Sequence, residues 1–387
     1  MSLFDPNPES IGTRAKKYAE STFEYYEHSA RRDIAQIKTV LEDWFAHFPA
    51  ASRRDLHQRF RSGSDRQHYG AFFELYTHEL LLRLGYTAEV HPDVPERTHP
   101  DFLVSRDGLR RFFVESTIGT QSDEEAGQQR LMDQVYDTLD RLKSPDFLLA
   151  LRVHGAPKTA PAGARLRRDL ERWLQTLDWA AVKQDWDIGG FDALPTYPWE
   201  HEGWSVLIQP IPKSPETRGS ADVRPVALNM PVTAFGITAD DDVKWAVSLK
   251  NKYGDLDLPF LLAINVMAEF CDQYDVMNGL FGHETVIFGP GGTRPGGRLH
   301  DGAWDGPRGP RNTSISAVMV YRDLKPWNMK DAVSWFVHNP WASRPLASAA
   351  LPFAQLVPNY DTGVLVQQDG NSPGSCLGLP EPWPPRE

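Results

Sequence analysis

The chain has 387 residues, long enough for two domains or for one core with large extensions. Its net charge of −11 argues against binding of long duplex nucleic acid by bulk electrostatics, because phosphate contacts need clustered lysines and arginines. Two widely separated cysteines argue against a disulfide scaffold or a zinc cluster, and without a membrane-length apolar stretch or a signal peptide we expect a cytoplasmic protein.

Residues 1–65 predict a helical N-terminal region that caps the core. Apolar spacing predicts helices over residues 14–28, 31–48 and 52–60. A group of arginines precedes the next helix, and a second group follows later. Each is interpreted either as a solvated helix face or as a patch for phosphate. They are Arg53, Arg54, Arg59, Arg61 and Arg66, and then Arg165, Arg167, Arg168 and Arg172.

The following helix is apolar on most sides, ends at Gly85, and carries Glu74 among its buried positions. A buried carboxylate must pair with a cation or hold a metal, because an isolated buried charge is too costly. Taken alone, Glu74 is most simply a salt bridge, with Arg66 or Arg83 as partner. His78 shares the helix face of Glu74 and is either a packing residue or a ligand.

Two predicted strands supply two further carboxylates. Pro100 and Asp101 open a strand over residues 102–104, and a turn at Asp107-Gly108 leads to a second strand over residues 111–118. Because side chains alternate along a strand, Glu115 faces the opposite side from Val114. Asp101 and Glu115 are therefore expected to meet at one end of a hairpin.

This order of a helix glutamate, a Pro-Asp and a strand glutamate resembles the PD-(D/E)xK phosphodiesterase superfamily, which includes restriction endonucleases. The match covers roughly residues 67–155, with Glu74, Pro100, Asp101 and Glu115 at family positions. It is also similar to a group of large bacterial proteins that carry Glu-x-Thr at this site. The resemblance implies that Asp101 and Glu115, with Glu74, bind Mg²⁺ or Mn²⁺, ions that prefer hard oxygen ligands.

Thr117 stands where the family carries its lysine, which orients the attacking water and offsets negative charge. Threonine supplies a hydroxyl but no charge, and losing such an electrostatic contact costs about 3 to 4 kcal/mol in the transition state. Another cation is then required, and sequence spacing places none. The candidates are Lys143, Arg110, Arg111, Lys250 and Lys252.

The remaining elements alternate between helix and strand. A helix over residues 123–142 and a strand over residues 147–153 match what the family core has next. Further helices are predicted over residues 165–177 and 240–253, and strands over 205–211, 232–237, 260–266 and 315–321. Residues 289–312 show no strand or helix pattern, as expected of a lid or a disordered loop. The tail after Gln367 is expected to be mobile.

The resemblance implies an α/β fold, a restriction-endonuclease-like mixed sheet flanked by helices. The predicted regions are the helical cap at residues 1–65, a nuclease-like core at 66–160, a C-terminal α/β region at 161–366 and the tail at 367–387. The expected function is metal-dependent hydrolysis of nucleic-acid phosphodiesters, DNA more than RNA, in bacterial defence or repair. The alternative is an inactive module of the same fold that binds nucleic acid or a partner protein.

Overall fold

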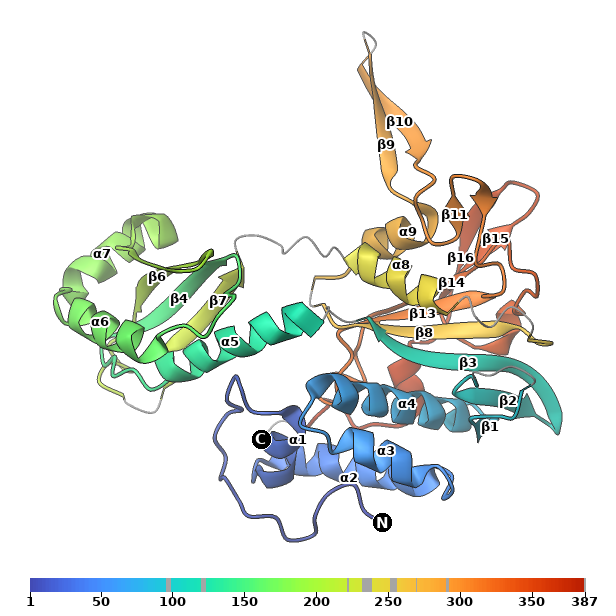
Figure 1. Cartoon of the computed structure of the whole chain (residues 1–387), viewed down its shortest axis with the longest axis horizontal. Helices are drawn as coiled ribbons and strands as arrows, with labels where there is room; N and C mark the ends of the chain where they lie inside the picture. Colours follow the sequence, from blue (N-terminus) through green and yellow to red (C-terminus); the bar gives the residue numbers. More distant parts are fainter. Residues whose placement is uncertain are drawn as a thin grey trace. The chain divides into compact units, whose positions relative to one another are not determined.

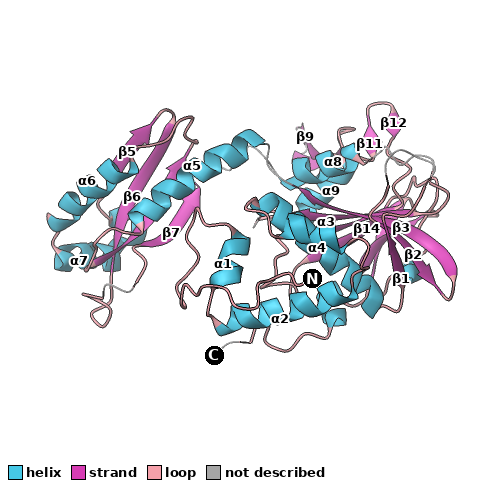
Figure 2. Cartoon of the chain, turned by 60° about the horizontal axis from the view of Figure 1, so that its bottom comes forward, coloured by secondary structure: helices cyan, strands magenta, loops and turns pink. Residues whose placement is uncertain are grey.

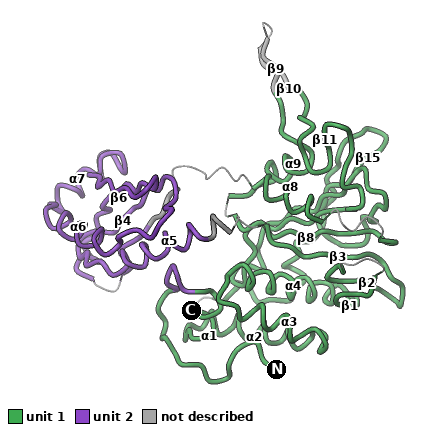
Figure 3. The backbone as a smooth tube through the Cα atoms, viewed as in Figure 1, with its two compact units in different colours: residues 1–15, 21–120, 237–387 green, residues 16–20, 121–236 purple. Residues whose placement is uncertain are grey.

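The chain folds into two compact units, the second inserted into the first (Figure 3). The computed structural model describes residues 1–94, 99–119, 123–220, 223–231, 239–250, 256–268, 270–289 and 292–385. Unit 1 comprises Met1–Ala15, Ser21–Thr120 and Ile237–Glu387, and unit 2 comprises Lys16–Glu20 and Gln121–Gly236. These limits differ from the predicted region boundaries near residues 65, 160 and 366, because unit 1 takes chain from both sides of unit 2.

Unit 1 is built on a large mixed sheet, as expected for an α/β protein. Its described strands follow the order β1-β2-β3-β8-β13-β14-β15-β16. β3, β8 and β13 are parallel neighbours in the centre, and β1, β2 and β3 form an antiparallel meander. The strands are β1 (Thr87–Val90), β2 (Phe102–Arg106), β3 (Leu109–Gly119), β8 (Phe260–Val266), β13 (Ala317–Arg322), β14 (Ser334–His338), β15 (Gln355–Asn359) and β16 (Val364–Gln368).

Helices cover both faces of this sheet (Figures 1 and 2). On one face, α4 (Asp65–Arg83) packs its phenylalanines into a core that includes Val114 and Leu261. On the other face, α8 (Ala239–Leu249) and α9 (Gln273–Phe281) share a second core with Phe113 and Leu262. Neighbouring residues of β3 therefore point to opposite cores, as the alternation along a strand requires.

The N-terminal helices pack against α4, and the predicted helix over residues 14–28 is wrong in its first half. The observed helices are α1 (Thr22–His28), α2 (Arg32–His47) and α3 (Arg53–Phe60). Ser21 starts α1 by a capping box with Glu24, which fixes the first turn at that point. Residues 16–20 instead belong to unit 2, where the backbone N–H groups of Tyr18 and Ala19 donate to Asp137.

Residues 289–312 contain strands, contrary to the prediction of a segment without strand or helix. β9 (Glu284–Gly289) pairs with β10 (Gly292–Arg298) in a hairpin that extends away from the sheet (Figure 1). β11 (Asp305–Gly306) and β12 (Gly309–Pro310) form a second short pair. The glycines and prolines hide the alternating pattern by which strands are recognised, while the backbone still forms ladder hydrogen bonds.

The C-terminal tail is packed rather than mobile, again contrary to expectation. After β16, the short helix η3 (Pro373–Leu377) leads to Trp383. Leu377 and Trp383 are buried in the core that α4 also lines. The Trp383 indole N–H donates to the carbonyl oxygen of Pro326 at 2.9 Å. Two large apolar side chains thus anchor a segment whose proline and glycine content suggested mobility.

Replacing Trp383 with alanine is expected to lower the free energy of unfolding by about 3 kcal/mol, because it removes a buried indole and leaves a cavity. Chemical denaturation of the full chain, followed by circular dichroism, measures this change. Tyr360→Ala is the matched control, since Tyr360 is 69% exposed and should change stability by less than about 0.5 kcal/mol. Equal effects of the two substitutions would contradict a packed tail.

Unit 2 has its own sheet and core. Its strands follow the order β5-β6-β4-β7, and its core gathers residues such as Leu151, Leu170 and Trp204. The elements are α5 (Asp123–Leu139), β4 (Phe147–His154), α6 (Gly163–Gln175), α7 (Trp179–Gly189), η1 (Gly190–Ala193), β5 (Tyr197–His201), β6 (Trp204–Pro212) and β7 (Val226–Pro231). The predicted strand over residues 147–153 exists, but it lies in this sheet and not beside β3.

Most of the remaining predicted elements are confirmed with shifts of one or two residues at their ends. The predicted strand over residues 232–237 lies outside the described residues, as does Lys252. A short helix, η2 (Ser348–Ala350), completes the described elements. None of the described helices combines the length and hydrophobicity needed to cross a membrane.

His283 connects the start of α8 to the β9 hairpin through two carboxylates. Its Nδ1 lies 2.8 Å from Asp301 Oδ2, and its Nε2 lies 2.9 Å from Asp240 Oδ2. Since both ring nitrogens face acceptors, the arrangement favours the doubly protonated imidazolium. The hydrogen bond to Asp301 raises the pKa of His283, burial and Lys244 oppose this, and the charges of both aspartates add to the rise.

This contact should make the protein less stable as the pH rises. A folded-state pKa above the unfolded value of about 6.5 means that the contribution is complete below that pH and is lost as the pH rises through the folded pKa. Melting temperatures measured from about pH 6 to about pH 9 should therefore fall more for the parent than for His283→Gln. Parallel pH profiles for the two proteins would contradict this prediction.

Candidate active site

Glu74 is fixed in a buried position in the middle of α4. Its residue surface is only 4% exposed, because apolar neighbours on almost every side of the helix pack against the sheet and the N-terminal helices. One carboxylate oxygen, Oε2, accepts a hydrogen bond of 2.6 Å from Arg59 Nη2 on α3. The other oxygen, Oε1, is buried and has no hydrogen-bond partner among the described residues. Burial raises the pKa of Glu74, and the Arg59 charge opposes that rise.

Asp101 stands at the entrance of β2, between the other two carboxylates. Its Oδ2 accepts a hydrogen bond of 2.7 Å from the backbone N–H of Ser116 on β3. Burial raises the pKa of Asp101 well above its usual range, and the charges of Glu115 and then Glu74 raise it further. The Ser116 N–H and Lys250 oppose this rise. An added cation would stabilise the charged form of Asp101, because Glu115 and Glu74 place like charges near it.

Glu115 lies on β3 one residue after Val114 and points to the face that α8 covers. It is 5% exposed. The Lys250 ammonium, in the residue directly after α8, donates a short hydrogen bond to Glu115 Oε1. β3 and β8 are parallel neighbours, so the helix that precedes β8 ends beside the start of β3, and this brings Lys250 to Glu115. The lysine is separated from Glu115 by 135 positions in sequence.

The three carboxylates are brought together, but they do not surround one point. Glu74 comes from the α4 face of the sheet and Glu115 points to the α8 face, while Asp101 lies at the end of the hairpin between them. Within the described ranges, no group of three or more His, Cys, Asp or Glu side chains is arranged to hold a metal ion. Mg²⁺ needs only one or two protein carboxylates, because it keeps several of its waters. Asp101 and Glu74, whose charges interact, are the carboxylates of this cluster that could supply such ligands.

Among the predicted candidate cations, the structure brings Lys250 to the carboxylates. Arg110 pairs instead with Asp257 at 3.1 Å in an exposed position, and Arg111 is exposed on β3. Lys143 lies in unit 2. Thr117 follows Glu115 on the same face of β3, two residues after the carboxylate that Lys250 contacts.

Two contributors to the site were not found from the sequence. Arg59, not Arg66 or Arg83, is the observed partner of Glu74, and Arg83 pairs with Glu79 one helical turn away. The backbone N–H of Ser116 donates to Asp101, and a contact from the backbone cannot be predicted from a side-chain motif. His78 is buried and packs against the rings of Phe48 and Phe102, and burial lowers its pKa to about 4. These contacts favour the packing role.

The described arginines of both groups are mostly paired within the protein. In unit 2, Arg165 and Arg172 pair with Asp169, and Arg167 pairs with Glu171, all within α6, which favours a solvated helix face. In unit 1, Arg53 donates to the backbone carbonyls of Phe48 and Ala46, and Arg61 pairs with Asp5 and Glu27 of other segments. The first group therefore links elements of unit 1.

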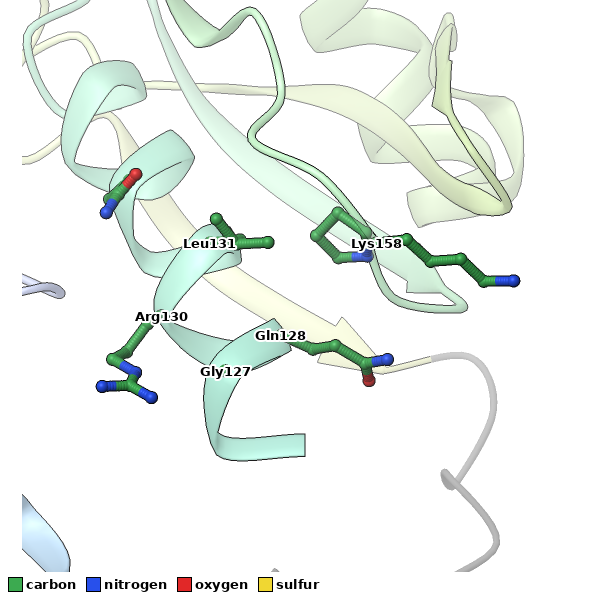
Figure 4. A pocket seen from close by; sticks show the side chains of 7 residues that line it. Gly127, Gln128, Arg130, Leu131 and Lys158 are labelled. Atoms are coloured by element: carbon green, nitrogen blue, oxygen red, sulfur yellow. The ribbon is translucent and has the colours of Figure 1, made fainter. Parts of the chain in front are cut away.

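A pocket of about 560 Å³ lies in unit 2, whereas the three carboxylates belong to unit 1. It is lined by α5 residues and by the loop after β4. Its cations, Arg130 and Lys158, point in different directions (Figure 4). Side chains that diverge in this way do not converge on one ligand group, so the candidate active site remains the cluster in unit 1.

Comparison with known proteins identifies no relative of this chain. No family model matches the chain, and searches of curated proteins and of solved structures returned no match. The function must therefore be inferred from the geometry of the carboxylates and their cations.

Proposed function

We propose that this protein is a metal-dependent nuclease that hydrolyses nucleic-acid phosphodiesters at the site of Glu74, Asp101 and Glu115. The observation that carries the proposal is the contact of Lys250 with Glu115. A partly buried lysine beside the second strand carboxylate would provide the charge that Thr117 lacks, and it reaches this place from a distant part of the sequence. The setting in bacterial defence or repair, and the preference for DNA, follow from the resemblance alone.

The order of elements supports a restriction-endonuclease-like core. The chain forms the helix of Glu74, then the Pro-Asp strand and the Glu115 strand. After unit 2 it continues with α8 and then β8, and β8 lies beside β3 in the sheet. A helix and then a strand are what the family core has next. In this interpretation unit 2 is an insertion between β3 and α8. The predicted helix over residues 123–142 and strand over residues 147–153 then belong to the insertion, and α8 and β8 take their place in the core.

The residues fit a divalent cation. The buried, unpartnered Oε1 of Glu74 and the raised pKa of Asp101 both indicate a place where added positive charge is stabilising. Asp101 and Glu74, with Glu115 nearby, would hold Mg²⁺ or Mn²⁺. When bound, the ion would neutralise charge that builds on the phosphoryl oxygens. In this proposal Lys250 would orient the attacking water and offset negative charge, and Thr117 would add a hydroxyl on the same strand face.

The second candidate function is a non-catalytic module that binds nucleic acid or a partner protein through the same surface. One observation favours it: Glu74 and Glu115 each already have a protein cation, in Arg59 and Lys250. Internal ion pairs of this kind can stabilise a fold without any reaction. The two candidates differ in whether a divalent metal produces cleavage.

A substrate panel tests the proposal. The purified full chain is incubated with plasmid, single-stranded DNA and RNA in Mg²⁺ or Mn²⁺, beside an Asp101→Ala variant and a chelator control. Cleavage that requires the metal and is absent from the variant supports the nuclease. Binding without cleavage in any metal supports the module instead. Cleavage that persists equally in the variant would show that these carboxylates are not responsible.

A further inference from the structure

We infer that Arg59 is a positioning residue of the candidate active site, so that the N-terminal helices form part of the site and not only a cap. This inference rests on the proposed metal site. The starting observation is the ion pair of Arg59 Nη2 with Glu74 Oε2 at 2.6 Å, in which the glutamate side chain is 5% exposed and the arginine side chain 31% exposed.

Arg59 is itself held in place. Its Nε donates to Asp55 Oδ2 at 2.7 Å, one turn earlier on α3. The planar guanidinium is thus fixed by a carboxylate on each side, which a flexible lysine cannot reproduce fully. α3 lies against α4, so the arginine reaches Glu74 across the contact between the two helices.

This clamp leaves one oxygen of Glu74 available. Because Oε2 is occupied by Arg59, the carboxylate group cannot rotate freely, and Oε1 keeps one orientation without a partner among the described residues. Without the arginine, Glu74 would lose the hydrogen bond that holds Oε2. Groups that hydrogen-bond to a metal-ligating carboxylate orient it, and their removal typically lowers metal affinity by about 10- to 100-fold.

Lys250 holds the carboxylate of Glu115 by a similar ion pair. The two outer carboxylates are each held by a cation from a helical segment outside the hairpin, Arg59 from before it and Lys250 from after it. Asp101, between them, is held by a backbone N–H. Asp101 is therefore the carboxylate of the three whose hydrogen bond in the described structure comes from the backbone and not from a side-chain cation.

The test measures Mn²⁺ affinity by electron paramagnetic resonance of the free ion, using the full chain. Arg59→Gln is expected to weaken binding by about 10- to 100-fold. Arg59→Lys, which keeps the charge but not the planar guanidinium, should recover part of that loss. Arg53→Gln is the matched control, because Arg53 lies on the same helix and donates only to the backbone carbonyls of Phe48 and Ala46 in the described structure. It should bind Mn²⁺ like the parent.

The outcomes separate this inference from the proposed function. Unchanged affinity in Arg59→Gln, or an equal loss in Arg53→Gln, would overturn the role of Arg59 while leaving a nuclease possible. Weaker Mn²⁺ binding in Arg59→Gln, with no cleavage by the parent on any substrate, would support the role and overturn the nuclease. A parent chain that binds no Mn²⁺ would overturn both. Melting curves of each variant show whether the fold is retained.

Discussion

Replacing Asp101 with asparagine is expected to lower the rate of metal-dependent cleavage by roughly a thousandfold. The substitution preserves size but removes the charge of the central carboxylate, and a metal ion supplies several kcal/mol of transition-state stabilisation, each 1.4 kcal/mol being worth a factor of ten. Single-turnover cleavage of the preferred substrate measures the loss. Titration with Mn²⁺ should show weaker binding in the same variant.

The same variant should be at least as stable as the parent. Burial and two neighbouring carboxylates raise the pKa of Asp101, so the charged group is unfavourable in the folded state until a cation is present. A neutral amide relieves that cost. Activity loss together with unchanged or raised melting temperature would therefore separate a role in chemistry from a role in folding. Full activity of Asp101→Asn would contradict the proposed function.

Replacing Lys250 with methionine is expected to lower the cleavage rate by about 100- to 1000-fold. The aliphatic stem of methionine fills similar space, while the variant loses the ammonium that contacts Glu115. The expected size is that of losing one preorganised electrostatic contact in a transition state. Because the lysine is proposed to orient water and to offset charge, the loss should appear in the rate at saturating substrate more than in substrate affinity.

Lys244→Met provides the comparison within α8, the helix that Lys250 directly follows. Lys244 lies in the middle of α8 and should leave the cleavage rate close to that of the parent. A double variant, Lys250→Met with Thr117→Lys, tests the interpretation directly by returning a lysine to the strand position at which the family carries it. Partial recovery of the rate would support an exchange of roles. Equal activity of Lys250→Met and the parent would exclude Lys250 from the reaction.

The carboxylates of the site could be found from the sequence because their pattern is local. A helix ending at Gly85, a Pro-Asp before an apolar strand and an alternating second strand lie close together along the chain. Their periodicity predicts element type and side-chain direction, and the structure confirms α4, β2 and β3. The register of β2 against β3 then places Asp101 beside the Glu115 strand.

The cations could not be found in this way, because they depend on contacts between distant elements. Lys250 reaches Glu115 only after β8 has paired with β3 across the insertion of unit 2. Arg59 reaches Glu74 across two packed helices, whereas sequence reasoning considered arginines on the helix of Glu74 itself. The packed tail was missed for a related reason, since Trp383 gains its burial from distant partners.

The insertion of unit 2 has a consequence during synthesis on the ribosome. β3 is translated well before β8, and at 5 to 20 residues per second the delay is on the order of ten seconds. During that time the inner edge of β3 lacks its parallel neighbour, and such an open edge invites pairing with other nascent chains. Unit 2, whose own strands pair within the inserted segment, can fold in the interval. A shortened gene product that stops before β8 should therefore aggregate instead of forming a smaller folded protein.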